Sequence, residues 1–293
     1  GAIRRQVNEE GLSAVAADDA THESLVALTK RMDERRERAL VSLAADLVRD
    51  DDGRVVVVRF EEVPDQAPLT PEAATQSDAD RSFERRIERL GEAFGVAVEA
   101  DEIVSHDTKH AIVNVAEGRD VDAIVAEHEP LRLRSRLIGD PIDWVVRHAP
   151  CDVLLVDSSD PQPAEKVAVS GETAPFPSAA VNVAESVASA HDGRVSLWYP
   201  AEGSDDRRAS IGEYRDDLST MFDVPVQADP IPSDRRPPDA DLLVHRGADH
   251  RLRGALADRS RAFTGAAGTT VTVYPRESRR QPLSRRLLER FLL

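Results

Sequence analysis

Asp52-Gly53-Arg54-Val55 opens a valine-rich run, and the same four residues return in the second half of the chain as Asp192-Gly193-Arg194-Val195. Three further stretches recur in the same order: residues 96–103 as 224–231, 121–125 as 240–244, and 149–156 as 267–274. A repeat this long indicates two copies of one domain and argues against a solenoid of short units. A chain of 293 residues has room for two domains of ordinary size.

Within the first copy, apolar runs that fit buried strands alternate with segments of helical periodicity. Residues 24–29 and 54–60 are predicted strands, and leucines recur at helical spacing between them. Gly53 is expected to end the intervening helix, because glycine tolerates the left-handed conformation of a helix C-cap. The alternation predicts an α/β fold, with a parallel sheet that carries helices on both faces.

The predicted organisation is two tandem doubly wound domains of Rossmann or flavodoxin-like type, the second one shortened. Seventeen positions separate Ser105 from Asp122, but eight separate the equivalent Ser233 and Asp241. A parallel crossover usually needs about a dozen residues or more, so the second copy is expected to cross in extended form and to lack its third helix. The expected boundaries are a linker at 1–23, a first domain at 24–157, a linker at 158–164, a second domain at 165–275 and a tail at 276–293.

The net charge of −16 argues against nucleic acid as a partner, because binding to phosphates needs clustered lysine and arginine. Lysine occurs at three positions, and the other 35 of the 38 basic residues are arginine. Abundant acid with scarce lysine is typical of proteins from salt-saturated cytoplasm, where charge repulsion is screened over about 3 Å at 1 M salt. The composition therefore predicts a halophilic protein whose acidic residues mainly solvate its surface.

Several features concern the cellular location. A single cysteine, Cys151, excludes an internal disulfide and favours a reducing compartment. Neither an apolar stretch of about 20 residues nor a signal peptide is found. Gly1 as first residue suggests a piece of a longer protein, and a cytoplasmic location is expected.

The tail from Arg276 to Leu293 is basic and amphipathic. Its leucines and Phe291 follow one helical stripe, while arginine exceeds glutamate on the remaining positions. Two interpretations remain open: a helix docked on its own domain or on a dimer mate, or a helix that docks on a membrane surface or a partner.

The segment from Asp122-Ala123-Ile124-Val125 to Ala149-Pro150-Cys151-Asp152-Val153 resembles the universal stress protein family, and a weaker resemblance extends over roughly residues 24–275. In that family a loop of the pattern Gly-x2-Gly-x9-Gly-Ser/Thr follows the fourth strand. Members that bind ATP use the loop because glycines let backbone N–H groups approach phosphate and a helix N-terminus favours the anion.

This chain departs from the family loop at most of its positions. Counting back from Gly139, the first two glycine positions hold Ala126 and Glu129, and the Ser/Thr position holds Asp140. The family's aspartate at the end of the first strand corresponds to Thr29, or to Ser170 in the second copy. In the second copy the loop pattern is counted from His245, and the second and third glycine positions hold Ala248 and Asp258.

The departures predict a degenerate nucleotide site. Two carboxylates about 4 Å from phosphate charges cost about 4 kcal/mol per pair at an effective dielectric near 20, which corresponds to about three decades of affinity. Three arginines in the same loop offer an alternative anion site. The candidate residues are Thr29, Ala126, Glu129, Arg132, Arg134, Arg136, Gly139 and Asp140. Neither copy is expected to bind ATP as the family does, and no cofactor is expected.

Other reactive residues give no catalytic pattern. His106 and His110 stand four apart on a predicted helix, a spacing that can hold a metal, but no third ligand is apparent. Cys151 opens a buried strand, where packing is a better interpretation than nucleophilic chemistry. No Ser-His-Asp arrangement has a recognisable local context, so the sequence predicts neither an enzyme nor a metal site.

Two functional hypotheses follow from the resemblance. Tandem domains with degenerate loops are similar to the soluble C-terminal portions of some prokaryotic amino-acid permeases and cation–chloride cotransporters. That similarity implies a non-catalytic regulatory or assembly module whose partners are the membrane portion of a parent transporter and a second copy, paired through sheet edges. The alternative is a free-standing tandem universal stress protein that binds ATP or another small anion in its first domain.

Overall fold

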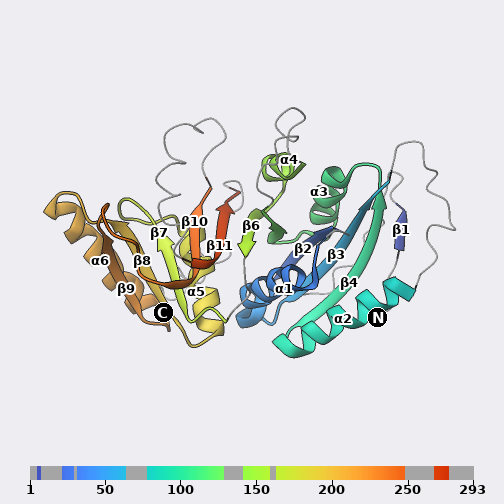
Figure 1. Cartoon of the computed structure of the whole chain (residues 1–293), viewed down its shortest axis with the longest axis horizontal. Coiled ribbons are helices and arrows are strands. Elements are labelled where there is room, and N and C mark those ends of the chain that lie inside the picture. Colours follow the sequence, from blue (N-terminus) through green and yellow to red (C-terminus); the bar gives the residue numbers. More distant parts are fainter. Residues whose placement is uncertain are drawn as a thin grey trace, which may run out of the picture. The chain divides into compact units, whose positions relative to one another are not determined.

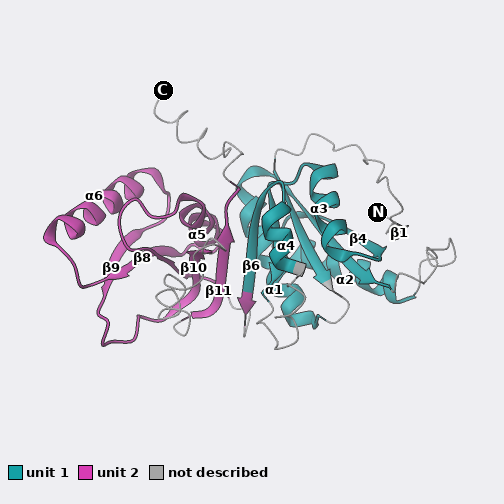
Figure 2. Ribbon diagram, turned by 90° about the horizontal axis from the view of Figure 1, so that it is seen from above, with its two compact units in different colours: residues 1–156 teal, residues 157–293 magenta. Residues whose placement is uncertain are grey.

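The structure is a computed structural model that describes residues 5–7, 22–29, 32–63, 78–128, 141–158, 163–247 and 267–276. It divides into two compact units, residues 1–156 and 157–293 (Figure 2). The tail expected to form a basic amphipathic helix lies, apart from its first residue Arg276, outside the described residues.

Unit 1 has a parallel sheet in the order β1-β4-β3-β2-β5-β6 (Figure 1). In its described residues, four helices and one short 3-10 helix lie between the strands. The elements are β1 (Arg5–Val7), β2 (Glu23–Thr29), α1 (Glu34–Val48), η1 (Arg49–Asp51), β3 (Arg54–Glu62), α2 (Asp78–Phe94), β4 (Ala97–Ser105), α3 (Thr108–Arg119), β5 (Ala123–Glu127), α4 (Pro141–His148) and β6 (Asp152–Ser158).

Unit 2 has a parallel sheet in the order β11-β10-β7-β8-β9. Its elements are β7 (Lys166–Ser170), α5 (Ser178–Ala190), β8 (Arg194–Pro200), α6 (Asp205–Met221), β9 (Val226–Ile231), β10 (Ala240–Arg246) and β11 (Ala267–Tyr274). Apart from β1, the two units share one strand order, in which the first strand of each copy lies at the centre. The α/β fold with two doubly wound parallel sheets is therefore confirmed.

The shortened crossover of the second copy is also confirmed. Residues 232–239, between β9 and β10, contain no helix. Ile231 and Ala240, at the two ends of this connection, lie in one apolar cluster with Trp198, which is 1% exposed. The connection, which includes a turn closed by Arg235 N to Pro232 O at 3.1 Å, thus begins and ends on the apolar cluster of unit 2.

One strand was not expected from the sequence. Residues 5–7 fall in the predicted linker, yet they form β1 and pair in parallel with residues 102–104 of β4. The polar sequence Arg5-Gln6-Val7 carries no strand signal of its own, so the pairing with β4 is what makes it a strand.

The repeated Asp-Gly-Arg-Val stretch forms the same corner in both units. Asp52 and Asp192 have positive φ values of 50° and 49°. The same two backbone hydrogen bonds close each corner. In unit 1, Gly53 N donates to Val48 O at 3.1 Å and Arg54 N donates to His22 O at 2.9 Å. In unit 2, Gly193 N donates to Ala188 O and Arg194 N donates to Glu165 O, both at 2.8 Å.

The expectation that Gly53 supplies the left-handed residue of this corner is wrong. Asp52 takes that conformation, which aspartate tolerates better than most residues because its short polar side chain bonds locally. Gly53 is needed for a different reason: a Cβ there would lie 2.4 Å from the carbonyl oxygen of His22. The glycine permits the close approach of two chain segments.

A second repeated bond fixes the first strand of each copy. The Asp122 side chain accepts from the backbone N–H of Glu23 at 3.0 Å, and the Asp241 side chain accepts from that of Lys166 at 2.8 Å. In each unit, an aspartate just before or at the start of the fourth strand therefore satisfies the first amide of the central strand.

A buried ion cluster holds α2 against β3 and β4. Arg59 Nη2 lies 2.6 Å from Glu102 Oε2 and 3.0 Å from Asp80 Oδ1, and the guanidinium lies over the Phe83 ring at 4.3 Å. The Glu102 side chain is 0% exposed. Burial and the neighbouring Asp80 raise the pKa of the Glu102 carboxyl, although Arg59 works in the opposite direction.

Replacing Glu102 with Gln is expected to flatten the pH dependence of stability. Because the folded pKa of Glu102 is raised, its favourable contribution is fully present below its ordinary value of 4.5 and is lost as the pH rises through the folded value. Gln keeps an acceptor for Arg59 without that ionisation. Urea unfolding of both proteins from acid to neutral pH measures this, and an unchanged slope in Glu102→Gln would contradict it.

Candidate functional site at the carboxyl edge of the first sheet

The candidate site lies where the strand order of unit 1 reverses. β3 and β4 lie on one side of β2, and β5 and β6 lie on the other. In open α/β sheets, ligands bind outside the carboxyl ends of the strands at such a point. Here the point is bounded by Thr29 at the end of β2, Glu127 at the end of β5, and the start of α1.

The N-terminus of α1 is already occupied by a carboxylate of the chain. Asp33 caps the helix and accepts from the backbone N–H groups of Arg35 and Arg36, both at 3.0 Å. Glu34 and Glu37 add negative charge in the first turn. Two of the amides at the start of α1, and its positive helix end, are therefore already engaged by carboxylates of the chain.

Arg36 joins the start of α1 to the end of β5. Its Nη1 pairs with Glu127 Oε1, and its Nε lies 3.3 Å from Asp33 Oδ2. The Glu127 side chain is 15% exposed, so its carboxylate is largely shielded from water. The cation at this edge is therefore engaged by two acids of the protein itself.

The structure places two of the predicted site residues. Ala126 lies in β5, is 4% exposed and pairs with Ala27 of β2, and Thr29 is the last residue of β2. The two thus lie on adjacent strands near their carboxyl ends. The other six candidates lie outside the described residues: Glu129, Arg132, Arg134, Arg136, Gly139 and Asp140. Their part in a site stays a prediction.

The Arg36–Glu127 pair was missed by the sequence reasoning. The predicted first glycine position, Ala126, is the next-to-last residue of β5, and the strand ends at Glu127. A glutamate at the end of an apolar strand is the signal that was available. Its partner is 91 residues away in the chain, and no local pattern connects the two.

The equivalent edge of unit 2 is covered by aromatic rings. A Cβ on Gly171 would lie 2.7 Å from the ring of Phe176, and one on Gly247 would lie 2.2 Å from the ring of Tyr274. The amides of these glycines already donate to Trp198 O at 3.0 Å and to Val273 O at 2.8 Å. Neither glycine presents a free amide to a phosphate.

The proposed equivalence of Thr29 and Ser170 holds for strand ends but not for register. β2 has seven residues and β7 has five. Ala27 pairs with Ala126, whereas Ser170 follows Val169, which pairs with Val244. When Asp122 of unit 1 is aligned with Asp241 of unit 2, Ser170 of β7 occupies the position of Ala27 in β2, which is two residues before Thr29.

The two histidines considered for metal binding have separate partners. His106 Nδ1 lies 3.2 Å from Val63 O, and His110 Nδ1 lies 2.8 Å from Asp107 Oδ2. Burial opposes ionisation of Asp107, but hydrogen bonds from His110 and from Lys109 lower the pKa of its carboxyl overall. Within the described ranges, no three His, Cys, Asp or Glu side chains are grouped so as to hold a metal ion.

Cys151 is buried at 2% exposure. Among the helices in the described parts of the chain, none is both long enough and apolar enough to cross a bilayer.

Comparison with solved structures shows the fold. The chain is similar to a universal stress protein from Archaeoglobus fulgidus (12% identity, TM-score 0.53, 87% of this chain and 97% of that one). It is also similar to the cytoplasmic domain of a prokaryotic cation chloride cotransporter (13% identity, TM-score 0.58, 87% of this chain and 95% of that one). It is also similar to a putative universal stress protein from Pseudomonas aeruginosa, with 16% identity and a TM-score of 0.51 over 86% of this chain and 92% of that one.

No curated protein matches the chain. The sequence model of the Universal stress protein family matches residues 25–157, which span the strands and helices from β2 to β6. Residues 25–157 therefore match the sequence model of the universal stress protein family, and 86–87% of the chain shares the fold of these solved structures.

Proposed function

We propose that this chain is a non-catalytic regulatory and assembly module, the cytoplasmic part of a membrane transporter of the amino-acid or cation–chloride type, with degenerate nucleotide sites. The observation that carries the proposal is the internal occupation of the carboxyl edge of unit 1. The Asp33 carboxylate accepts hydrogen bonds from two amides of α1, and the Glu127 carboxylate forms an ion pair with Arg36. A phosphate that bound at the start of α1 would have to displace both carboxylates, which supports a role of this edge in holding elements together.

The similarity to a cotransporter cytoplasmic domain supports the transporter assignment. In this proposal the partners are the membrane portion of the parent transporter and a second copy of the chain. Among the described strands β1 and β9 lie at the outer edges, and an outer edge is where a second copy could add a strand. The acidic, lysine-poor composition suits a halophilic cytoplasm.

A second candidate is a free-standing tandem universal stress protein that binds ATP or another small anion in unit 1. The family match over residues 25–157 favours it. Arg132, Arg134 and Arg136, which follow β5, supply the positive charge that such an anion needs.

Calorimetry with ATP and Mg²⁺ at high salt separates the two candidates. The regulatory module is expected to show no saturable binding up to about 1 mM nucleotide. A Kd of that size corresponds to a binding free energy of about −4 kcal/mol. Micromolar binding that Gly139→Asp abolishes would establish the second candidate. Gly118→Asp is the matched control, because it adds the same charge on an exposed helical position of α3.

The coding sequence upstream of Gly1 tests the transporter assignment independently. The proposal expects a series of apolar spans of about 20 residues there. An upstream sequence without such spans would contradict it, whatever the outcome of the calorimetry.

A further inference from the structure

The outer edge of β4 carries a strand, β1, that is shorter than β4 itself. β1 pairs with residues 102–104, three of the nine residues of β4 (Figure 1). These three residues are 0%, 3% and 3% exposed, whereas residues 97–101 are half-buried or exposed. β1 therefore lies along the buried half of the strand, which contains the apolar residues Ile103 and Val104.

Alternate residues of β4 present their backbone groups to this outer edge. Val63, the residue after β3, donates its N–H to Ser105 O at 3.0 Å, so the backbone groups of Ser105 face β3. Successive residues of a strand direct their N–H and C=O groups to opposite sides. The backbone groups of Ala100, Glu102 and Val104 therefore face the outer edge, where β1 covers the last two.

The same edge of unit 2 is closed by a proline. In the repeat, Pro230 of β9 corresponds to Glu102 of β4. Ala201 N donates to Ile231 O at 2.9 Å, so the backbone groups of Ile231 face β8 and those of Pro230, one residue earlier, face outward. Proline has no N–H to offer a further strand and blunts such edges. One edge position is thus protected in two ways, by a proline in unit 2 and by a covering strand in unit 1.

Without β1, the edge of β4 would be a template for strand pairing. The outward amides and carbonyls of Glu102 and Val104 would lose their cover, next to an apolar stretch of the strand. Glu102 carries an N–H at the position where unit 2 has proline, so its backbone does not close the edge. An exposed edge strand of this kind pairs readily with another chain.

The charges of β4 are compatible with such pairing between copies. Glu99 Oε2 lies 2.8 Å from Arg119 Nη2, and Glu102 Oε2 lies 2.6 Å from Arg59 Nη2. Repulsion from Asp101 is screened over about 3 Å at 1 M salt. Pairing of one edge with the same edge of a second copy is self-complementary and gives a closed two-fold dimer.

We propose that β1 is a releasable guard, which covers the β4 edge in the single chain and, when it leaves, lets that edge pair with the β4 edge of a second copy. Residues 8–22 separate β1 from β2, so release of the guard leaves the pairing of β2 with β3 intact. The choice of a second copy as partner rests on the assembly role proposed above. In that role, a pull on the chain upstream of β1 would release the guard and favour dimerisation.

Proline substitutions in β1 test whether it is a guard. Ile103 faces β3, and in a parallel pair its partner Gln6 then supplies the backbone groups that face β4, whereas those of Val7 face outward. Gln6→Pro is expected to undock β1, to open the Glu102 and Val104 amides to hydrogen exchange in dilute protein, and to tighten self-association by about tenfold in analytical ultracentrifugation. Val7→Pro is the matched control and should change neither, because proline is tolerated where its missing N–H faces outward.

Two measurements on the Gln6→Pro chain locate the pairing edge. Concentrating this chain should restore the protection of the Glu102 and Val104 amides, because the second copy takes the place of β1. Adding Ala100→Pro, which puts the proline device of unit 2 on β4, should return self-association to the level of the unmodified chain. Self-association that leaves the two amides exposed would overturn the guard, as would a Gln6→Pro chain that associates no more tightly than Val7→Pro.

The guard and the proposed function fail in different experiments. These measurements involve neither ATP nor a membrane portion, whereas the upstream coding sequence tests the transporter assignment alone. A chain that has the upstream apolar spans but shows no effect of Gln6→Pro would therefore remove the guard and leave the transporter assignment standing.

Discussion

Replacing Gly53 or Gly193 with alanine is expected to lower the free energy of unfolding of the affected unit by about 3 kcal/mol. The new Cβ would lie 2.4 Å from the carbonyl oxygen of His22 in the first case and of Glu165 in the second. Both oxygens are backbone atoms that already accept a corner hydrogen bond. The clash therefore cannot be relieved by turning a side chain.

Two other glycines provide matched controls for this substitution. Gly118 and Gly212 lie in helices, and a Cβ on either meets nothing within 4 Å. Alanine there is expected to stabilise the protein by about 0.5–1 kcal/mol, because glycine is a poor helix former. Denaturant unfolding measures all four variants, and equal stability of Gly53→Ala and Gly212→Ala would contradict the close-approach argument.

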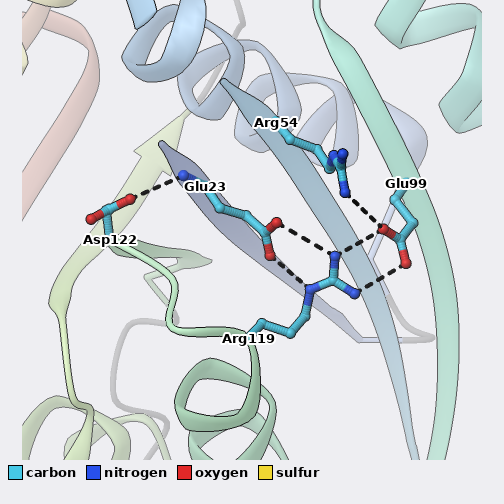
Figure 3. A network of polar contacts seen from close by, with 5 residues as sticks. All are labelled: Glu23, Arg54, Glu99, Arg119 and Asp122. Atoms are coloured by element: carbon cyan, nitrogen blue, oxygen red, sulfur yellow. Dashed lines mark hydrogen bonds and ion pairs between the residues drawn. The ribbon is translucent and has the colours of Figure 1, made fainter. Parts of the chain in front are cut away.

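Replacing Arg119 with Met is expected to cost about 3–5 kcal/mol. Arg119 lies between two carboxylates at the amino end of the first sheet, with Nε 2.7 Å from Glu23 Oε1 and Nη2 2.8 Å from Glu99 Oε2 (Figure 3). Burial alone would lower the pKa of the Arg119 guanidinium, but these bonds raise it, so the group stays charged. Because Glu23 is 7% exposed, Met would leave a buried carboxylate without its cation.

Arg54 is the control within the same network. Its Nη1 lies 3.9 Å from Glu99 Oε2, and its side chain is 29% exposed, so Arg54→Met is expected to cost less than about 1 kcal/mol. Adding Glu23→Gln to Arg119→Met should recover part of the loss, since it removes the buried charge. Chemical denaturation of the series checks both expectations, and equal losses for Arg54→Met and Arg119→Met would rule out the buried-charge explanation.

The layout of the fold could be predicted because it depends on patterns that are local or repeated. Alternating apolar runs and helical periodicity gave the α/β class, and the short spacing between Ser233 and Asp241 gave the missing helix. The role of Gly53 could not be predicted in the same way. It depends on the position of the His22 carbonyl, which belongs to another segment of the chain.

The candidate site was predictable in part. The family pattern located Thr29 and Ala126, which the structure places on adjacent strands. The pairing of Arg36 with Glu127 joins a helix start to a distant strand end. Such contacts arise only when the sheet has assembled, so a single sequence carries no periodic signal for them.

The helix-free connection between β9 and β10 also limits how unit 2 can rearrange. It must cross three inter-strand spacings, about 14 Å, while returning about seven residues along the sheet, about 23 Å. The diagonal is about 27 Å, and the nine steps from Ile231 to Ala240 reach about 30 Å at full stretch. A turn closed by Arg235 N to Pro232 O at 3.1 Å takes up the remaining length, so the segment acts as a short tether. Sliding β10 further toward its amino end would stretch this tether to its limit, so the tether keeps the strand in its register.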